Sequence, residues 1–280
     1  MEFYADVASL QSAMADHRRA GRSIGFCPTM GALHQGHLSL IEASRKENDI
    51  TICSIYVNPT QFNDPEDLQK YPRELDRDRD MLAEAGCDGL FFPSDEMMYP
   101  KPAVMAMQFG PLENVMEGVH RAGHFNGVGL VVAKLLHLVG PTRAYFGQKD
   151  LQQFAVIRQM VEDLMFPVDL VCVPIVRESD GLAMSSRNAR LSPVARKTAA
   201  QLYAFLQEAR EQLLQGRSVM SVGQWVRAQL GEHRDINLEY FEIVHSHTLQ
   251  SISKMNSSEP TSLCIAAWVG GVRLIDNLTV

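Results

Sequence analysis

One apolar run that leads into a glycine-rich, histidine-bearing turn constrains this chain more than any other feature. Residues 24–27 read IGFC, residues 28–37 read PTMGALHQGH, and a helix is expected from about residue 36 to 46. A helix that starts after such a turn presents unpaired N–H groups and the positive end of its dipole, which attract anions. Gly31 and Gly36 allow a tight turn and the close approach of a ligand. The pattern predicts a strand, a phosphate-binding turn and a helix.

Two histidines in this turn strengthen the prediction. His34 and His37 are three residues apart, so on a helical turn they would point to one side and reach the same phosphates. A surface turn with two incidental histidines is the alternative, because short motifs also arise by chance. Two further polar turns, 58–61 and 147–150, follow other predicted strands. Since ligands bind at the carboxyl ends of strands in open parallel sheets, the three turns predict one site.

Strand-like and helical segments alternate through the first 174 residues. Strands are expected at 23–27, 50–57, 89–92, 144–146 and 168–174, an extended segment at 104–109, and helices at about 6–19, 36–46, 75–85, 127–139 and 151–164. The segment 50–57 is almost wholly apolar and β-branched, as parallel strands covered on both faces tend to be. This alternation predicts the α/β class, with a Rossmann-like parallel sheet and right-handed crossovers.

The pattern changes after residue 174. Amphipathic helices are expected at 193–215 and 219–230, and strands follow at 238–244 and 262–269. Helices followed by antiparallel-style strands are typical of an α+β unit. The sequence therefore predicts a Rossmann-like nucleotide-binding domain over 1–174 and a smaller C-terminal α+β domain over 175–280, which we expect to act as a lid.

Composition excludes several classes of protein. The net charge is −7 and no long basic stripe exists, which disfavours a nucleic-acid binder. The longest apolar stretch is interrupted by Lys134 and His137, and the N-terminus lacks the pattern of a secretory signal. Five cysteines are spread without any Cys-x-x-Cys, so we expect small reduced core residues. We expect a cytosolic protein that contacts neither nucleic acid nor membrane.

The turn at 147–150 supplies the second part of the predicted site. Lys149 would bring a compact cation to the same edge of the sheet, where it suits phosphate oxygens, although a solvated lysine is the alternative. Asp150 stands where the N-cap of the next helix is expected. Of Gln152 and Gln153, one is expected to face the crevice and the other the solvent.

A loop at 177–188 supplies the third part. It contains Gly181 and ends in Met184, Ser185, Ser186 and Arg187. Two hydroxyls, several backbone N–H groups and a guanidinium suit a phosphate chain. The loop lies at the predicted domain junction, where a mobile segment could close over a ligand, and a polar interdomain linker is the alternative.

Taken in order, these blocks resemble a known family. His34-Gln-Gly-His37 with the downstream Met184-Ser-Ser-Arg187 is similar to the His-x-Gly-His and Lys-Met-Ser-Lys-Ser motif pair of the nucleotidylyltransferase and class I aminoacyl-tRNA synthetase superfamily. Within it, the chain resembles the pantoate–β-alanine ligase family. The blocks that carry the match are PTMGALHQGH (28–37), VNPTQF (57–62), YPR (71–73), GHFNGV (123–128), FGQKDLQQ (146–153) and RESDGLAMSSRN (177–188).

The resemblance implies a reaction in two steps. The carboxylate of pantoate attacks the α-phosphate of ATP, which gives pantoyl adenylate and pyrophosphate. The amine of β-alanine then attacks the acyl carbon, which gives pantothenate and AMP. Magnesium accompanies the ATP, and a homodimer is implied. Because no covalent enzyme intermediate is required, positioning and charge neutralisation should dominate catalysis.

Carried over by position, the resemblance also implies site residues. The ATP-binding set is Met30, Gly31, Ala32, Leu33, His34, Gln35, Gly36, His37, Gly147, Gln148, Lys149, Asp150, Val176, Met184, Ser185, Ser186 and Arg187. Catalytic roles are implied for His34, His37, Lys149, Ser185, Ser186 and Arg187. Pantoate and β-alanine are expected at Gln61, Gln153, Asn58 and Arg121, with His124 and Arg121 in a mobile wall on the β-alanine side.

The chain departs from the family pattern at two positions. Gln148 stands where many members carry Glu, which removes a carboxylate from the phosphate rim. Arg77 stands where some members have an Asp near the magnesium. Asp78 is a candidate for a metal-bound water, and the magnesium ligands stay unassigned because ATP oxygens and waters fill most of that shell.

Other functions were weighed against the ligase. A transferase that moves AMP or CMP to a phosphate or alcohol would not need the neutral polar pocket predicted from residues 58–62 and Gln153. A non-catalytic nucleotide sensor would not need both histidines, Lys149 and the 177–188 loop. A tRNA synthetase would need an anticodon-binding module or a basic face, and neither is visible.

Overall fold

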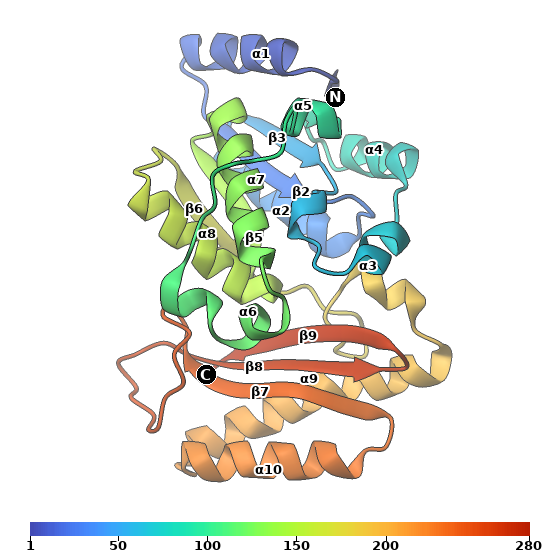
Figure 1. Cartoon of the computed structure of the whole chain (residues 1–280), viewed down its shortest axis with the longest axis vertical. Coiled ribbons are helices and arrows are strands. Elements are labelled where there is room, and N and C mark those ends of the chain that lie inside the picture. The colour runs from blue at the N-terminus through green and yellow to red at the C-terminus, as the bar shows by residue number, and fades with distance from the viewer.

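The computed structural model describes residues 1–280 and contains two β-sheets (Figure 1). The larger sheet has the strand order β1-β4-β3-β2-β5-β6, and every neighbouring pair is parallel. Its strands are β1 (Glu2–Tyr4), β2 (Ile24–Thr29), β3 (Ile50–Ile55), β4 (Gly89–Phe91), β5 (Arg143–Gly147) and β6 (Asp169–Val173). The prediction of an α/β fold with a parallel sheet is confirmed.

Helices cover both faces of this sheet. They are α1 (Val7–Arg19), α2 (Gln35–Glu47), α3 (Pro65–Lys70), α4 (Leu75–Glu84), α5 (Asp95–Met98), α6 (Met116–His120), α7 (His124–Val139) and α8 (Leu151–Asp163), with short 3₁₀ turns η1 (Pro59–Gln61), η2 (Gly110–Glu113) and η3 (Gln148–Asp150). Ile24 and Phe26 of β2 belong to the core cluster shared with α1, α7 and α8, whereas Cys27 belongs to the cluster shared with α2 and α4. Alternate strand residues thus feed two separate cores, which explains the continuous apolar runs.

The C-terminal part is a three-stranded antiparallel sheet with two helices behind it. The strands are β7 (Ile236–His245), β8 (Thr261–Val269) and β9 (Val272–Thr279), the helices are α9 (Pro193–Leu214) and α10 (Val219–Glu232), and a 3₁₀ turn, η4 (Ser186–Arg190), precedes them. The sheet lies between this helix pair and the parallel-sheet half (Figure 1). Val244 and Cys264 join the core of the larger half, so the two halves pack directly together.

Some sequence expectations are wrong. The strands β1 and β9 were not predicted, and the segment expected to be extended at 104–109 pairs with no sheet. Both missed strands lack a clear apolar pattern: β1 has three residues, and β9 is interrupted by the buried polar pair Asp276 and Asn277. Cys172 is exposed because β6 is the edge strand, and the other four cysteines are buried as expected. None of the helices combines the length and apolar character that crossing a bilayer requires.

Candidate active site

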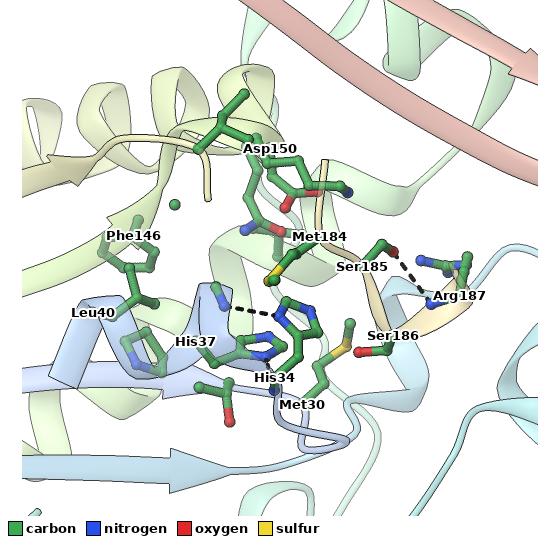
Figure 2. A pocket seen from close by; sticks show the side chains of 18 of the residues that line it. Met30, His34, His37, Leu40, Phe146, Asp150, Met184, Ser185, Ser186 and Arg187 are labelled. Carbon is green, nitrogen blue, oxygen red and sulfur yellow. Dashed lines mark hydrogen bonds between the residues drawn. The ribbon is translucent and has the colours of Figure 1, made fainter. Parts of the chain in front are cut away.

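A pocket opens where the carboxyl ends of the central parallel strands meet (Figure 2). It gathers polar residues from segments that are far apart in the sequence. They are Thr29 at the end of β2, His34 and His37 after β2, Gln61 after β3, Lys149, Asp150 and Gln153 after β5, and Ser185, Ser186 and Arg187 beyond β6, with the apolar Met30 among them. Val128, Val131, Val132 and Leu135 of α7 line one wall. The three polar turns singled out in the sequence, together with the 177–188 loop, therefore share one cavity.

The two histidines cap the helix that follows them. His34 is the N-cap of α2, and its Nδ1 accepts a hydrogen bond from the Gly36 N–H at 3.1 Å. The His37 Nδ1 accepts from the His34 N–H at 3.3 Å, and the ring centroids are 4.1 Å apart. Because each Nδ1 accepts, the proton of each neutral ring resides on Nε2. Both bonds are visible in Figure 2, where the rings lie side by side in the pocket.

Both imidazoles are neutral near pH 7. Burial, followed by the positive charge of Lys149, lowers the pKa of His34 to about 4. Burial, followed by neighbouring His34 and Lys149, lowers the pKa of His37 to about 3. The histidines therefore offer Nε2–H donors rather than positive charge, and positive charge at the pocket comes from Lys149 and Arg187.

Asp78 of α4 holds the turn in shape. Its carboxylate oxygens accept hydrogen bonds from the Ala32 and Leu33 N–H groups, each at 2.7 Å. Gly31 and Ala32 have φ values of 80° and 50°, and a Cβ at position 31 would lie 2.9 Å from Asp78 Oδ2. The carboxylate thus stabilises a left-handed backbone that only glycine adopts freely. Asp78 therefore shapes the turn from behind.

Gln61 is fixed from two sides. Asn58 Nδ2 donates to Gln61 Oε1 at 3.3 Å and to the Gly127 carbonyl at 3.1 Å. The His124 Nδ1–H donates to the Gln61 carbonyl at 2.7 Å. The Gln61 amide lines the pocket and contacts Met30 Sδ at 2.8 Å, whereas Asn58 is buried behind it. The expected pair of Asn58 and Gln61 is therefore one pocket residue and one supporting residue.

The expectation for the two glutamines on α8 is half wrong. Gln153 faces the pocket. Gln152 does not face solvent but is 4% exposed, and its Nε2 donates to the Leu112 and Val115 carbonyls at 2.6 and 2.9 Å. Its Oε1 accepts from the Glu117 N–H at 2.9 Å. Gln152 thus fastens α8 to the segment before α6.

The loop after β6 folds over the turn after β2. Ser186 Oγ donates to the Ala32 carbonyl at 3.0 Å, which joins residues 154 positions apart. Ser185 Oγ accepts from the Arg187 N–H at 3.2 Å (Figure 2), and the Arg187 guanidinium pairs with Asp67 at 2.7 Å. Sequence reasoning missed Asp67, which only its place in the acidic first turn of α3 could have signalled.

Several expected site residues lie outside this pocket. Gln148 points to the C-terminal sheet, where its Nε2 donates to Asn277 Oδ1 and Thr279 Oγ1, both at 3.3 Å. Arg121 lines an adjoining polar cavity and pairs with Glu117 at 3.6 Å. Asp150, by contrast, lines the pocket; it stands at the N-cap of α8, but its side chain makes no capping hydrogen bond. Of the turn after β2, Gly31, Ala32, Leu33 and Gln35 are absent from the pocket lining.

Comparisons with known proteins agree with this geometry. The family model described as pantoate-beta-alanine ligase matches residues 2–279. A pantothenate synthetase from Cytophaga hutchinsonii is 46% identical over 275 residues, which are 98% of this chain and 97% of that protein. The crystal structure of pantothenate synthetase from Thermus thermophilus superposes with a TM-score of 0.92 at 46% identity, covering 99% of each chain.

A third similar protein carries ligands. The crystal structure of a pantoate-beta-alanine ligase from Francisella tularensis, complexed with beta-gamma ATP and beta-alanine, superposes with a TM-score of 0.81 at 34% identity. The match covers 99% of this chain and 97% of that one.

Proposed function

Because this chain belongs to the pantoate-beta-alanine ligase family, we propose that it joins pantoate to β-alanine at the expense of ATP. The reaction passes through pantoyl adenylate and releases pyrophosphate and AMP. The observation that carries this proposal is the shared pocket, in which the histidine turn, the Gln61 and Gln153 amides and the Ser185–Arg187 loop all meet. The relatives are named pantothenate synthetases and the family model is that of a pantoate-beta-alanine ligase, so the alternative adenylyl or cytidylyl transferase is not supported.

The cationic and N–H donor groups of the pocket suit the phosphates of ATP. Lys149 and Arg187 supply positive charge, and the Nε2–H groups of His34 and His37 supply neutral donors. When the pantoate carboxylate attacks the α-phosphorus, the bond to the bridging oxygen breaks and charge moves onto the departing pyrophosphate. Donors that are already in place stabilise this charge without reorganisation. We assign adenylation to these residues, with the Ser185 hydroxyl as a further donor and Ser186, whose hydroxyl donates to the Ala32 carbonyl, holding the loop against the histidine turn.

The neutral end of the pocket suits a small hydroxy acid. The side-chain amides of Gln61 and Gln153 offer both donors and acceptors to a carboxylate and hydroxyl groups. Val131 and Val132 provide an apolar surface for the branched carbon skeleton. In the second step the β-alanine amine attacks the acyl carbon, and the acyl–oxygen bond of the adenylate breaks. The two amides hold the acid through both steps.

Magnesium fits this site as part of the nucleotide substrate. No group of three His, Cys, Asp or Glu side chains forms a cage for a metal ion. Both oxygens of Asp78 already accept backbone hydrogen bonds, and Asp150 is the carboxylate that lines the pocket beside Lys149. We therefore expect the ion to arrive on ATP, with phosphate oxygens and waters as its ligands.

Three further expectations stay predictions. Residues 175–280 would act as a lid domain over the nucleotide, the enzyme would be a homodimer, and it would work in the cytosol. The hydrogen bond from Ser186 to the turn after β2 supports the lid role, because it joins a loop at the start of this domain to the pocket wall.

Omitting one substrate at a time tests the proposed function. Pyrophosphate is expected when ATP, magnesium and pantoate are mixed, and AMP is expected to accumulate only after β-alanine is added. Pyrophosphate release that does not depend on pantoate would refute the substrate assignment, and AMP formed equally fast without β-alanine would refute the second step.

A further inference from the structure

Two adjacent residues of the C-terminal strand β9 form hydrogen bonds to the backs of two segments that line the pocket. Asp276 and Asn277 lie on β9 and are 6% and 3% exposed. Burying a charged and an amide side chain side by side is unfavourable unless both find partners. Their partners lie on the two segments that carry Lys149 and the Ser185–Arg187 loop, about a hundred or more residues away in sequence.

Asn277 holds the Lys149 turn. Its Nδ2 donates to the Gln148 carbonyl at 2.9 Å and to the Lys149 carbonyl at 3.0 Å. Its Oδ1 accepts from Gln148 Nε2 at 3.3 Å. The turn η3 has three residues and no side-chain cap of its own, and Asp150 makes no capping bond to α8. The backbone of Lys149 is thus fixed largely from the other sheet.

Asp276 holds the second wall. Its carboxylate takes a bidentate pair of bonds from Arg177 at 2.6 and 2.9 Å. The same guanidinium donates to the Gly181 carbonyl at 3.1 Å and lies 3.6 Å from the Tyr203 ring centroid. The backbone of Arg177 also forms an isolated antiparallel β-bridge with Ala183, one residue before Met184. A planar, bidentate guanidinium fixes direction as well as distance, so the loop is anchored at its base.

The two anchors are joined to each other. The Asn277 N–H donates to Asp276 Oδ1 at 2.7 Å, and Arg177 Nη2 donates to the Asn277 carbonyl at 3.2 Å. A displacement of either wall is therefore transmitted to the other through two neighbouring residues of one strand. Preorganised donors lose effectiveness steeply when they are misplaced by about 1 Å.

We propose that Asp276 and Asn277 are positioning residues for the nucleotide step, which set the distance between Lys149 and the Ser185–Arg187 loop. This inference rests on the proposed function of the pocket for its kinetic readout. A purely structural role in sheet packing predicts a different outcome, namely a loss of stability with unchanged ATP recognition.

The test uses Asn277→Asp, which keeps the size of the side chain but replaces two donors by an acceptor that faces two carbonyls. We expect the KM for ATP, and its Kd by calorimetry, to rise about tenfold while the KM for β-alanine stays within about twofold. Val272→Ala on the same strand is the matched control, because Val272 is buried in the C-terminal core and lines neither wall. It should lower the free energy of unfolding without changing the KM for ATP.

A double-mutant cycle with Lys149→Ala tests whether Asn277 affects ATP binding through Lys149. In that background Asn277→Asp should change the Kd for ATP by less than about twofold, because the group it positions is gone. Fully additive effects, or an unchanged ATP affinity in Asn277→Asp itself, would overturn the inference. Asn277→Ser carries the same expectations if Asn277→Asp does not fold.

The outcomes separate this inference from the proposed function. A wild-type protein that releases no pantoate-dependent pyrophosphate contradicts the ligase, yet the calorimetric comparison of ATP binding still decides the role of Asn277. An active wild type with an Asn277→Asp variant of equal ATP affinity contradicts the inference alone.

Discussion

A single neutral imidazole is expected to carry a large share of adenylation. The Nε2–H of His37 is available because its Nδ1 is occupied by the His34 N–H. His37→Ala removes this donor from the pocket and should lower kcat for pantoate-dependent pyrophosphate release about a hundredfold. The measurement is pyrophosphate release at saturating substrates. Glu42→Ala, an exposed position on the same helix, is the control and should retain wild-type activity. Wild-type activity in His37→Ala would leave the histidine turn without a catalytic role.

Gln61 is expected to act on the acid rather than on the nucleotide. Gln61→Ala removes an amide that lines the pocket, so the KM for pantoate should rise at least about tenfold while the KM for ATP changes less than about twofold. Asn58→Ala leaves the Gln61 amide in place and removes its hydrogen bond from behind, together with the Asn58 bond to the Gly127 carbonyl, so the rise in the KM for pantoate should be smaller. Steady-state kinetics with each substrate varied in turn measures both. A larger rise for ATP than for pantoate would contradict the assignment of this end of the pocket.

At the same scale, residue type and position predicted which side chains face the pocket better than which ones support it. His34 and Lys149 follow predicted strands, so sequence order alone placed them at one edge of the sheet, whereas Gln153 was named from the family resemblance and Arg187 from the donor-rich loop at 177–188. Asp78, named only as a candidate for a metal-bound water from the family resemblance, has two oxygens that clamp the turn. They accept hydrogen bonds from backbone N–H groups 45 and 46 residues away, and no sequence pattern records these contacts.

At the scale of elements, the approach of α7 to η1 shapes the acid end of the pocket. A Cβ at Gly127 would lie 2.3 Å from the Thr60 carbonyl oxygen and 2.7 Å from Gln61 Cα. Gly127→Ala should therefore push α7 away, lower the free energy of unfolding by about 1–3 kcal/mol and raise the KM for pantoate. Urea denaturation and steady-state kinetics measure the two effects. Gly231→Ala on α10 has open space around its Cβ and should stabilise the fold slightly. An unchanged Gly127→Ala would show that α7 can shift freely.

Helices and strands with a clear apolar periodicity were predicted from the sequence, whereas strands that form only through pairing with other segments were not. The helix at 193–215 and the strand at 50–57 have strong apolar patterns, and both exist within two residues of the expected bounds at each end. The strand β1 is held by parallel pairing to β4, and β9 carries buried polar residues that its own sequence does not explain. Their stability comes from partners outside the segment, which a local period cannot reveal.

At the scale of the whole molecule, the contacts between the two halves lie beyond sequence reasoning. Arg273 of β9 donates two hydrogen bonds of 2.8 Å to Glu117 of α6, and the Tyr240 hydroxyl donates to the same carboxylate at 2.8 Å. The hydrogen bonds and charge of Arg273, the nearby charge of Arg121 and the hydrogen bond from Tyr240 hold the pKa of Glu117 at about 2 despite burial. The sequence predicted two units, but long-range charged pairs such as this one follow no spacing rule, and they decide how the units meet.

Stability of the whole chain should depend on pH through its buried histidines. Burial lowers the pKa of His34 and His124 to about 4 and that of His37 to about 3, whereas an unfolded histidine titrates near 6.5. Below about pH 6.5 the unfolded chain therefore binds more protons than the folded one, so stability is fully present above this pH and falls as the pH drops toward 4. At pH 5.5 we expect a loss of roughly 1 kcal/mol for each of the three residues. Urea denaturation at pH 7.5 and 5.5 measures this loss, and the double variant His34→Gln/His37→Gln should show a loss smaller by about 2 kcal/mol. The pKa of Glu117 lies well below the range between pH 5.5 and 7.5, so this carboxyl does not affect the comparison. An equal loss of stability in the wild type and in the double variant would mean that the two imidazoles are already solvated in the folded state.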